Sequence, residues 1–168
     1  DELSEKMLKF MSDNRIDTTH VKKISGSTTG LYLISLVGGE RSFSYWRNNS
    51  AATLLGQDRN DIEQAMKKQD LIYFSGVTLA ILDQSSRNNL FSCLKLARRA
   101  GKKIAFDPNL RPKLWNDKAE MRDVIMAGAN LSDIILPSFD DEAAWFSDPD
   151  PISTCLLYTS PSPRDETK

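Results

Sequence analysis

The sequence predicts an α/β fold built on a mostly parallel sheet flanked by helices. Three short apolar runs end on polar residues at Ser75, Asp107 and Ser138, which lie a little over 30 residues apart. A helical pattern follows each run, and repeats of this length are typical of strand–helix–strand units with parallel strands. Because such crossovers are right-handed, we expect the three strand ends at one edge of the sheet.

The first part of the chain predicts a helix and then a hairpin. Apolar residues recur at helical spacing over residues 2–12, which indicates an amphipathic helix. Two runs rich in β-branched and aromatic residues, 28–37 and 41–46, flank Gly38 and Gly39, a pattern typical of a β-hairpin. We expect this hairpin, over about residues 28–47, to be a flap outside the main sheet.

Helices and buried strands alternate in the middle of the chain. Asn60 and Glu63 have the spacing of a capping box, in which each side chain binds the backbone N–H of the other residue at the start of a helix. Residues 70–74 form the first apolar run of the sheet. Residues 86–100 predict a helix with one apolar face, on which Cys93 is expected to be a buried, reduced thiol.

The same alternation continues after this helix. The strand 103–107 is followed by a second predicted capping box, at Asp117 and Glu120, which opens a helix. Residues 133–137 predict the third strand, and residues 140–146 the start of a last helix. Short apolar runs of this kind are typical of strands that are buried on both faces.

The composition excludes several classes of function. The 168 residues are 40% hydrophobic and 27% charged, and a net charge of −1 favours neither nucleic acid nor an anionic membrane. No apolar run approaches the roughly 20 residues that span a bilayer. His20 is the only histidine, which excludes Ser-His and Cys-His nucleophiles and a His-rich metal site. No secretory signal is visible, so a cytoplasmic protein is expected.

Polar residues after the strand 103–107 predict a ligand site. Asp107, Asn109 and Arg111 follow the apolar run, and Pro108 cannot continue a strand ladder. The carboxyl edge of an open α/β sheet is where ligands bind, and an arginine there suits a carboxylate or a phosphate. A plain turn with an Asp cap and a solvated arginine is the alternative interpretation.

Six motifs occur along the chain: Thr29-Gly30-Leu31-Tyr32, the run from Arg41 to Arg47, Ser50-Ala51-Ala52, Tyr73-Phe74-Ser75-Gly76, the run from Asp107 to Trp115, and the run from Leu136 to Glu142. In this order they resemble the ribokinase-type (PfkB) carbohydrate kinases, over about residues 1–152. Within that family the chain most resembles the 2-keto-3-deoxygluconate kinases. The resemblance implies a ribokinase-like fold in which the hairpin is a lid.

The resemblance also implies a reaction, in which the γ-phosphoryl group of ATP, with Mg²⁺, passes to a hydroxyl of a sugar acid, 2-keto-3-deoxygluconate. It assigns substrate binding to Tyr32, Tyr45, Arg47 and Arg111, and nucleotide binding to Asn109 and Arg111. Cross-strand aromatic packing and a plain surface charge are the alternative interpretations of the hairpin residues.

The same resemblance implies that Glu142 is a metal ligand. It matches the acid of an Asn-x-x-Glu magnesium motif, although the Asn position of that motif reads Ser138 or Phe139 here. A water-bridged Mg²⁺ near Asp140, Asp141 or Glu142 is one alternative. Acids placed in the first turn of a helix for its dipole are another.

Other functions remain open. Another sugar kinase of the family, such as a fructokinase, is the near alternative, and a non-catalytic sugar-binding or assembly module is the alternative from another class. A dinucleotide-dependent enzyme is disfavoured because no Gly-x-Gly-x-x-Gly follows a predicted strand. Many relatives resemble dimers formed through the flap, so a homodimer of the complete enzyme is expected.

The predicted kinase domain, residues 1–154, is expected to be incomplete at both ends. The family's catalytic Gly-Ala-Gly-Asp run has no counterpart in the 168 residues, so we expect no catalytic aspartate and no ATP turnover from this chain alone. The run from Cys155 to Asp165 resembles the translation of a sequencing adapter, which predicts a non-native, disordered tail over residues 155–168. A genuine disordered tail is the alternative.

Overall fold

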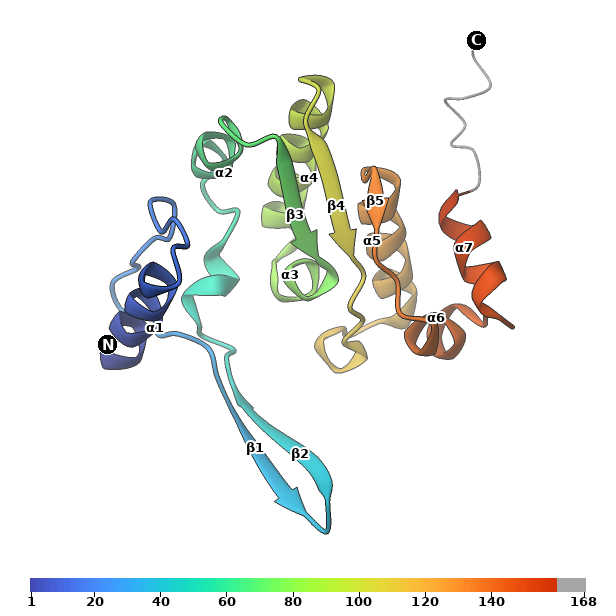
Figure 1. Cartoon of the computed structure of the whole chain (residues 1–168), viewed down its shortest axis with the longest axis horizontal. Coiled ribbons are helices and arrows are strands. Elements are labelled where there is room, and N and C mark those ends of the chain that lie inside the picture. Colours follow the sequence, from blue (N-terminus) through green and yellow to red (C-terminus); the bar gives the residue numbers. More distant parts are fainter. Residues whose placement is uncertain (160–168) are drawn as a thin grey trace.

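The computed structural model describes residues 1–159 and confirms an α/β fold with a parallel sheet (Figure 1). The elements in chain order are α1 (Glu2–Asp13), β1 (Leu31–Val37), β2 (Glu40–Trp46), η1 (Ala51–Leu54), α2 (Arg59–Met66), β3 (Leu71–Ser75), α3 (Gly76–Ile81), α4 (Gln84–Arg99), β4 (Lys103–Asp107), η2 (Pro112–Leu114), α5 (Lys118–Asn130), β5 (Ile134–Ile135), α6 (Phe139–Phe146) and α7 (Pro151–Thr159). Strands β3, β4 and β5 pair in that order as parallel neighbours, and β1 and β2 form a separate antiparallel hairpin.

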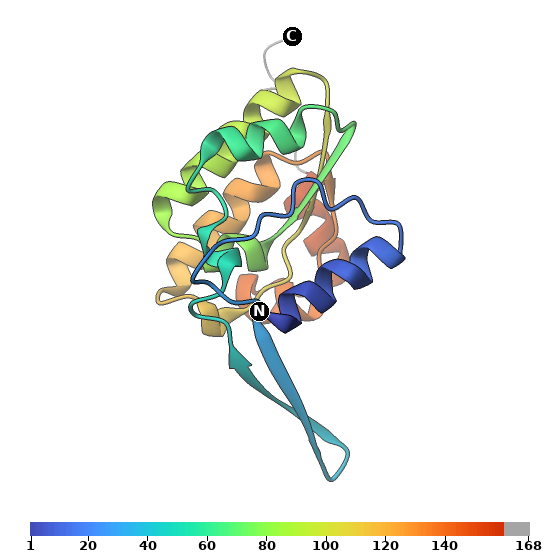
Figure 2. The same cartoon turned by 90° about the vertical axis from the view of Figure 1, so that its left-hand side faces the viewer.

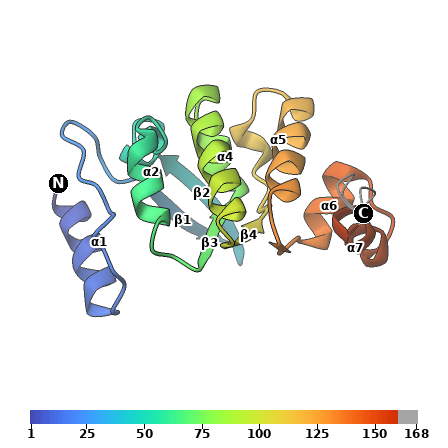
Figure 3. The same ribbon diagram turned by 90° about the horizontal axis from the view of Figure 1, so that it is seen from above.

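Among the described residues, helices cover only one face of the sheet. Figure 3 shows α2, α4 and α5 on the same side of β3 and β4. On that side Ile72 lies beside Ile104, and Phe74 beside Phe106, and all four side chains are buried. The two phenylalanine rings stack with their centroids 4.6 Å apart. Each buried side chain of this size stabilises the fold by about 1.5–3 kcal/mol, so this face carries the core.

The opposite face of the sheet is open. Leu71 and Tyr73 on β3 are 54% and 58% exposed, and Ile134 on β5 is 46% exposed. The prediction that these strands are buried on both faces is therefore wrong for β3 and β5, because no described helix packs on this side. β5 is also shorter than the predicted strand 133–137, although the Leu136 N–H still donates to the Phe106 carbonyl at 2.9 Å.

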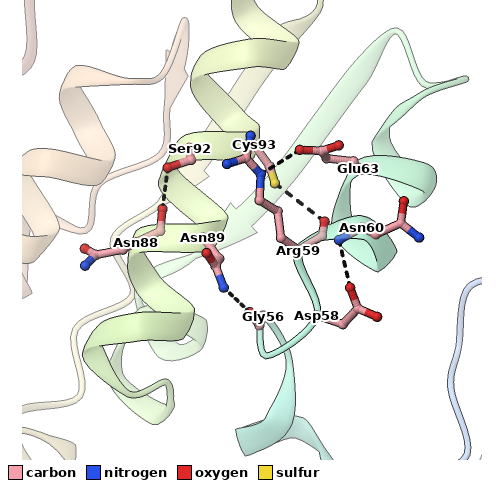
Figure 4. Close-up of polar contacts among 9 residues, drawn as sticks. All are labelled: Gly56, Asp58, Arg59, Asn60, Glu63, Asn88, Asn89, Ser92 and Cys93. Carbon is pink, nitrogen blue, oxygen red and sulfur yellow. Dashed lines mark hydrogen bonds and ion pairs between the residues drawn. The ribbon is translucent and has the colours of Figure 1, made fainter.

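The start of α2 differs from the predicted capping box. Asp58, not Asn60, is the N-cap, and its carboxylate accepts a hydrogen bond from the Asn60 backbone N–H at 2.9 Å (Figure 4). Glu63 instead pairs with Arg59, with 2.7 Å between Oε1 and Nε. An ion pair four residues apart on a helix competes with the reciprocal cap for the same carboxylate, and here the ion pair forms.

Two hydrogen bonds tie α4 to the chain around the start of α2 (Figure 4). The Asn89 side-chain amide donates to the Gly56 carbonyl at 2.9 Å, and the Cys93 thiol donates to the Arg59 carbonyl at 3.8 Å. Gly56 has φ of +92°, and an added Cβ would lie 2.9 Å from the Ser86 carbonyl oxygen. Both the backbone conformation and the space therefore require glycine here. Cys93 is buried and free, as predicted.

The helices beside the central strand begin at aspartates. Asp83 caps α4 by accepting a backbone hydrogen bond at 2.7 Å, so the helix starts before the predicted residue 86. Asp117 caps α5 as predicted, with a bond of 2.9 Å. Glu120 does not complete the predicted capping box, because its carboxylate binds Arg87 on α4 at 2.7 Å. A tertiary ion pair has replaced the local contact.

The predicted hairpin is confirmed, and it projects alone from the rest of the chain (Figures 1 and 2). Its register places Tyr32 opposite Tyr45 and Ile34 opposite Phe43, so these four side chains share one face. Leu31 pairs with Trp46 on the other face. Apolar side chains are exposed on both faces, and exposed apolar patches of this kind are typical of interaction sites.

The predicted disorder of residues 155–168 is wrong over residues 155–159, which belong to α7. Two side-chain hydrogen bonds hold α7: the Tyr158 hydroxyl donates to Glu142 Oε1 on α6 at 2.8 Å, and the Thr154 hydroxyl donates to Asp148 Oδ2, between α6 and α7, at 2.7 Å. These contacts fix a helix where composition alone indicated none. Residues 160–168 lie outside the described residues, and the non-native origin of the tail stays a prediction.

Candidate active site

The carboxyl ends of β3 and β4 meet at one edge of the sheet. Ser75 ends β3 and pairs in register with Asp107, which ends β4. Gly76 begins α3 in contact with the loop after β4, and an added Cβ there would lie 1.9 Å from the Pro108 carbonyl oxygen. The two strand exits are thus packed backbone to backbone, and only glycine permits that approach. β5 runs parallel to β4, and Ser138 follows it as the N-cap of α6.

A tyrosine binds the acid at this edge. The Tyr73 hydroxyl donates to Asp107 Oδ2 at 3.1 Å on the open face of the sheet. Desolvation raises the pKa of Tyr73, and its hydrogen bond to Asp107 and the charge of Asp107 raise it further. Tyr73 therefore stays protonated at neutral pH and remains a donor. This role of Tyr73 could not be predicted from the sequence, because the contact depends on the parallel register, which sets Ala105 beside Tyr73 and Asp107 two residues beyond.

The loop after β4 presents the predicted Asn109 and Arg111 at this edge. Pro108 and Leu110 are buried, whereas Asn109 is half-buried and Arg111 is exposed. Asn109 has φ of +36°, a left-handed conformation that asparagine tolerates better than most residues. The Arg111 guanidinium folds back, and Nη1 donates to the Leu110 carbonyl at 2.7 Å. The loop therefore contains the side-chain amide of Asn109 and the cation of Arg111, and the cation binds the backbone of the loop itself.

The predicted hairpin residues form one cluster. The rings of Tyr32 and Tyr45 have centroids 6.3 Å apart, and Phe43 stacks on Tyr45 at 6.1 Å. Arg47 places its guanidinium carbon 4.3 Å from the centre of the Tyr45 ring, a cation–π contact that holds the positive charge over this face. Arg47, directly after β2, is half-buried, whereas all residues of β2 are exposed. We call Tyr32, Tyr45 and Arg47 the hairpin cluster.

The predicted site residues thus fall into two groups. Strands β3 and β4 point toward the side from which the hairpin projects (Figure 1). Among residues 1–159, no hydrogen bond or ion pair that the structure shows joins the hairpin cluster to Asn109 or Arg111. A ligand held between them would touch the aromatic and cationic face of the hairpin on one side and the loop after β4 on the other.

Glu142 lies apart from both groups. It is completely buried on α6, where Tyr158 binds Oε1 and Oε2 has no partner in the described part of the chain. Burial raises the pKa of Glu142 to about 7, the hydrogen bond from Tyr158 lowers it, and the charges of Asp148 and Asp141 raise it. Residues 1–159 contain no group of three or more acids, histidines or cysteines placed to hold a metal ion. This arrangement does not support a metal bound to Glu142.

Arg87, a buried arginine behind the loop after β4, was also not predicted as a functional residue from the sequence. Arg87 lies on the apolar face of α4, at helical spacing from Leu90 and Leu94, and is 8% exposed. A charge on an otherwise apolar helical stripe is a signal that the sequence does contain. Its partners could not be found from the sequence, because they come from α5 and from the loop after β4.

Comparison with known proteins identifies the family. The model of the pfkB family carbohydrate kinases matches residues 1–160. A 2-dehydro-3-deoxygluconokinase of Haemophilus influenzae is 40% identical over 151 residues, which are 88% of this chain and 48% of that protein. Fructokinase-1 of Zea mays is 30% identical over 136 residues, 80% of this chain and 41% of that protein. The chain spans about half the length of the curated relatives it matches.

Solved structures agree with this comparison. A PfkB protein from Polaromonas sp. JS666 has a TM-score of 0.82 at 28% identity, covering 94% of this chain and 53% of its own. A sugar kinase from Pyrococcus horikoshii, solved in complex with ATP, has a TM-score of 0.74 at 26% identity and covers 88% of this chain and 47% of its own. The ribokinase-like fold is therefore confirmed, and the chain belongs to the pfkB family of carbohydrate kinases.

Proposed function

We propose that the complete protein transfers the γ-phosphoryl group of ATP to a hydroxyl of 2-keto-3-deoxygluconate, for which 2-dehydro-3-deoxygluconate is another name. Four relatives with the matching kinase name are 37–40% identical to this chain and one, from Thermoproteus tenax, is 30% identical, whereas the fructokinases are 29–30% identical. The structural observation that carries the proposal is the hairpin cluster, in which Arg47 stands over the Tyr45 ring.

The hairpin cluster suits an acid sugar. The Arg47 guanidinium can form two parallel hydrogen bonds to a carboxylate, and Tyr45 beneath it limits its freedom before the ligand arrives. Tyr32 adds a second ring and a second hydroxyl on the same face. A neutral sugar would use the rings and hydroxyls but would leave the guanidinium without a matching charge. The arrangement therefore favours a sugar acid over fructose.

The loop after β4 suits phosphate. In the proposed reaction Arg111 leaves the Leu110 carbonyl and turns to the transferred phosphoryl group or the substrate, and Asn109 donates to the phosphates of ATP. Phosphoryl transfer depends mostly on positioning and on the neutralisation of charge, which is what an amide and a guanidinium can supply. Support for ATP comes from the family and from the ATP complex of the structural relative.

The proposed reaction uses ATP together with Mg²⁺, as phosphoryl transfer by kinases does. Among residues 1–159, Glu142 Oε1 accepts a hydrogen bond from Tyr158, and no three acids, histidines or cysteines lie together as a metal site. We therefore assign the metal to no residue described here and derive no step through it.

A homodimer through the flap is part of the same proposal. The hairpin face opposite the hairpin cluster exposes Leu31, Leu33, Val37 and Trp46. Such a face on an unpaired two-stranded hairpin is suited to another copy of the chain. A purely structural assembly module would use both faces in this way, and it would not need Arg47. The kinase proposal is therefore preferred because it accounts for the cation as well as the apolar residues.

The test compares two substrates in the complete enzyme. Arg47→Ala should lower kcat/KM for 2-keto-3-deoxygluconate by about 10–100-fold, since a charge-assisted hydrogen bond contributes about 1.5–3 kcal/mol, and should change turnover of fructose far less. Arg41→Ala, on β2 near the hairpin tip, is the matched control and should change neither. Equal losses for both sugars would reject the sugar-acid assignment, and no phosphorylation of either would reject the proposed function.

A further inference from the structure

A buried guanidinium connects three elements behind the loop after β4. Arg87 Nε donates to the Leu82 carbonyl at 3.0 Å, and Nη1 donates to Glu120 Oε1 at 2.7 Å. Its guanidinium carbon also lies 5.2 Å from the centre of the Trp115 ring. The arginine thus links α4 to the end of α3, to the first turn of α5 and to the end of the loop. We call Arg87, Glu120 and Trp115 the arginine clamp.

The loop is anchored at each end and in its middle. At its start Pro108 is buried against Gly76, and in its middle Leu110 is 2% exposed. At its end Trp115 packs on the core beside Arg87. Asn109 and Arg111, the two residues proposed to contact ligands, lie between these anchors. Their placement therefore depends on the anchors, of which the arginine clamp is the only charged one in the described chain.

Stability alone does not explain a charge at this position. Arg87 occupies the apolar stripe of α4, where a leucine or methionine would fill similar volume without the cost of removing a charge from water. Replacing a buried ion pair by apolar residues often leaves stability unchanged or improves it. What a leucine could not do is direct hydrogen bonds to two elements and a cation to an aromatic face. An arginine at this position therefore contributes the defined geometry of its contacts rather than stability alone.

We propose that Arg87 is a positioning residue, which through Glu120 and Trp115 holds the loop after β4 so that Asn109 and Arg111 meet the substrates. This inference rests on the proposed function. Arg87 itself is buried, and its hydrogen bonds go to Leu82 and Glu120 rather than to Asn109 or Arg111. It therefore acts on the loop only through Glu120 and Trp115. A misplacement of about 1 Å in such a loop costs about 100-fold in rate, which is the effect expected when the clamp is removed.

The experiment measures loop order and kinetics in the complete enzyme. In Arg87→Met, amide hydrogen exchange over residues 109–116 should rise by about tenfold, with exchange in β3 and β4 unchanged. kcat for sugar-acid phosphorylation should fall by about 100-fold with a smaller change in KM. Arg87→Lys keeps the charge but loses the fork, and should recover part of both losses.

Arg98→Met is the matched control. Arg98 lies on the same helix and makes an ion pair with Asp133 at 3.4 Å, away from the loop. It should stay within about twofold of the parent in kcat, as surface substitutions usually do. If Arg87→Met did not fold, Glu120→Gln would take its place, with faster exchange over residues 109–116 expected.

The outcomes separate this inference from the proposed function. The exchange measurement needs no substrate. A parent enzyme that is inactive on the sugar acid would therefore reject the proposed function, and the loop exchange could still be interpreted. Equal increases of exchange in the loop, β3 and β4 would show that Arg87 only stabilises the core, and would overturn the inference. Unchanged loop exchange would overturn it as well.

Discussion

The Tyr158 hydroxyl donates a hydrogen bond to Glu142 Oε1 at 2.8 Å, and this bond joins α7 to α6 over a completely buried carboxyl group. Oε2 of the same group has no partner in the described part of the chain. With its pKa raised to about 7, chiefly by burial, Glu142 is about half protonated near neutral pH. The contact between the two helices is therefore sensitive to pH.

Glu142→Gln is predicted to flatten the pH dependence of stability. An acid whose pKa is higher in the folded chain, about 7 against 4.5, binds its proton more tightly when folded. Its stabilising contribution is full below pH 4.5 and is lost as the pH rises to about 7, by about 3 kcal/mol in all. The glutamine stays neutral, so urea unfolding should show a variant more stable than the parent at alkaline pH.

Asp140→Asn is the control for this measurement, because Asp140 is exposed in the first turn of the same helix. That variant should keep the fall in stability between about pH 5 and about pH 7. A parent chain whose stability rises with pH over this range would contradict the prediction.

Removal of residues 155–168 is predicted to return Glu142 to ordinary behaviour. The deletion takes away Tyr158 and half of α7, so water reaches the carboxyl group and its pKa should fall toward 4.5. NMR titration of the glutamate side chain measures this directly. Tyr158→Phe is the matched variant, since it removes only the hydroxyl; it should raise the pKa further, because the hydrogen bond lowers it. Identical titration in the deleted and intact chains would show that α7 does not cover Glu142 in solution.

Gly76→Ala is predicted to destabilise the chain by about 3 kcal/mol or more. The added Cβ would lie 1.9 Å from the Pro108 carbonyl oxygen, and backbone on both sides must move to relieve the overlap. Gly38→Ala is the control, because its Cβ meets nothing and only its φ of +60° opposes alanine, at about 1–2 kcal/mol. Chemical denaturation of both variants gives the comparison, and equal losses would contradict a steric origin.

The sequence was sufficient where a signal is local and periodic. Apolar runs about one βαβ unit apart predicted the parallel sheet, and Gly38 with Gly39 predicted the hairpin, because these patterns follow directly from strand and turn geometry. Tyr45 and Arg47 were predicted as substrate-binding residues through family motifs, and the structure adds that they are in contact.

Contacts between distant segments were the part that could not be predicted. Glu120 was expected to close a capping box and instead binds Arg87, 33 residues away. Tyr158 orders a segment whose composition indicated disorder. In both cases a local preference of about 1 kcal/mol competes with a tertiary contact of similar size, and only the packed fold decides which one forms.

Lysine substitutions on the open face of the sheet are predicted to reduce self-association of the 168-residue chain. Leu71 and Tyr73 on β3 and Ile134 on β5 are exposed on this face, with Ala105 of β4 between Tyr73 and Ile134, and exposed apolar residues of this kind promote association in water. Leu71→Lys with Ile134→Lys places two charges on this face without touching the core. Leu96→Lys is the matched control, since Leu96 is 45% exposed but lies on α4. At equal concentration, light scattering should give a lower apparent molecular mass for the double variant than for the parent chain, and no change for Leu96→Lys. A similar decrease in Leu96→Lys would mean that added charge, not the sheet face, governs association.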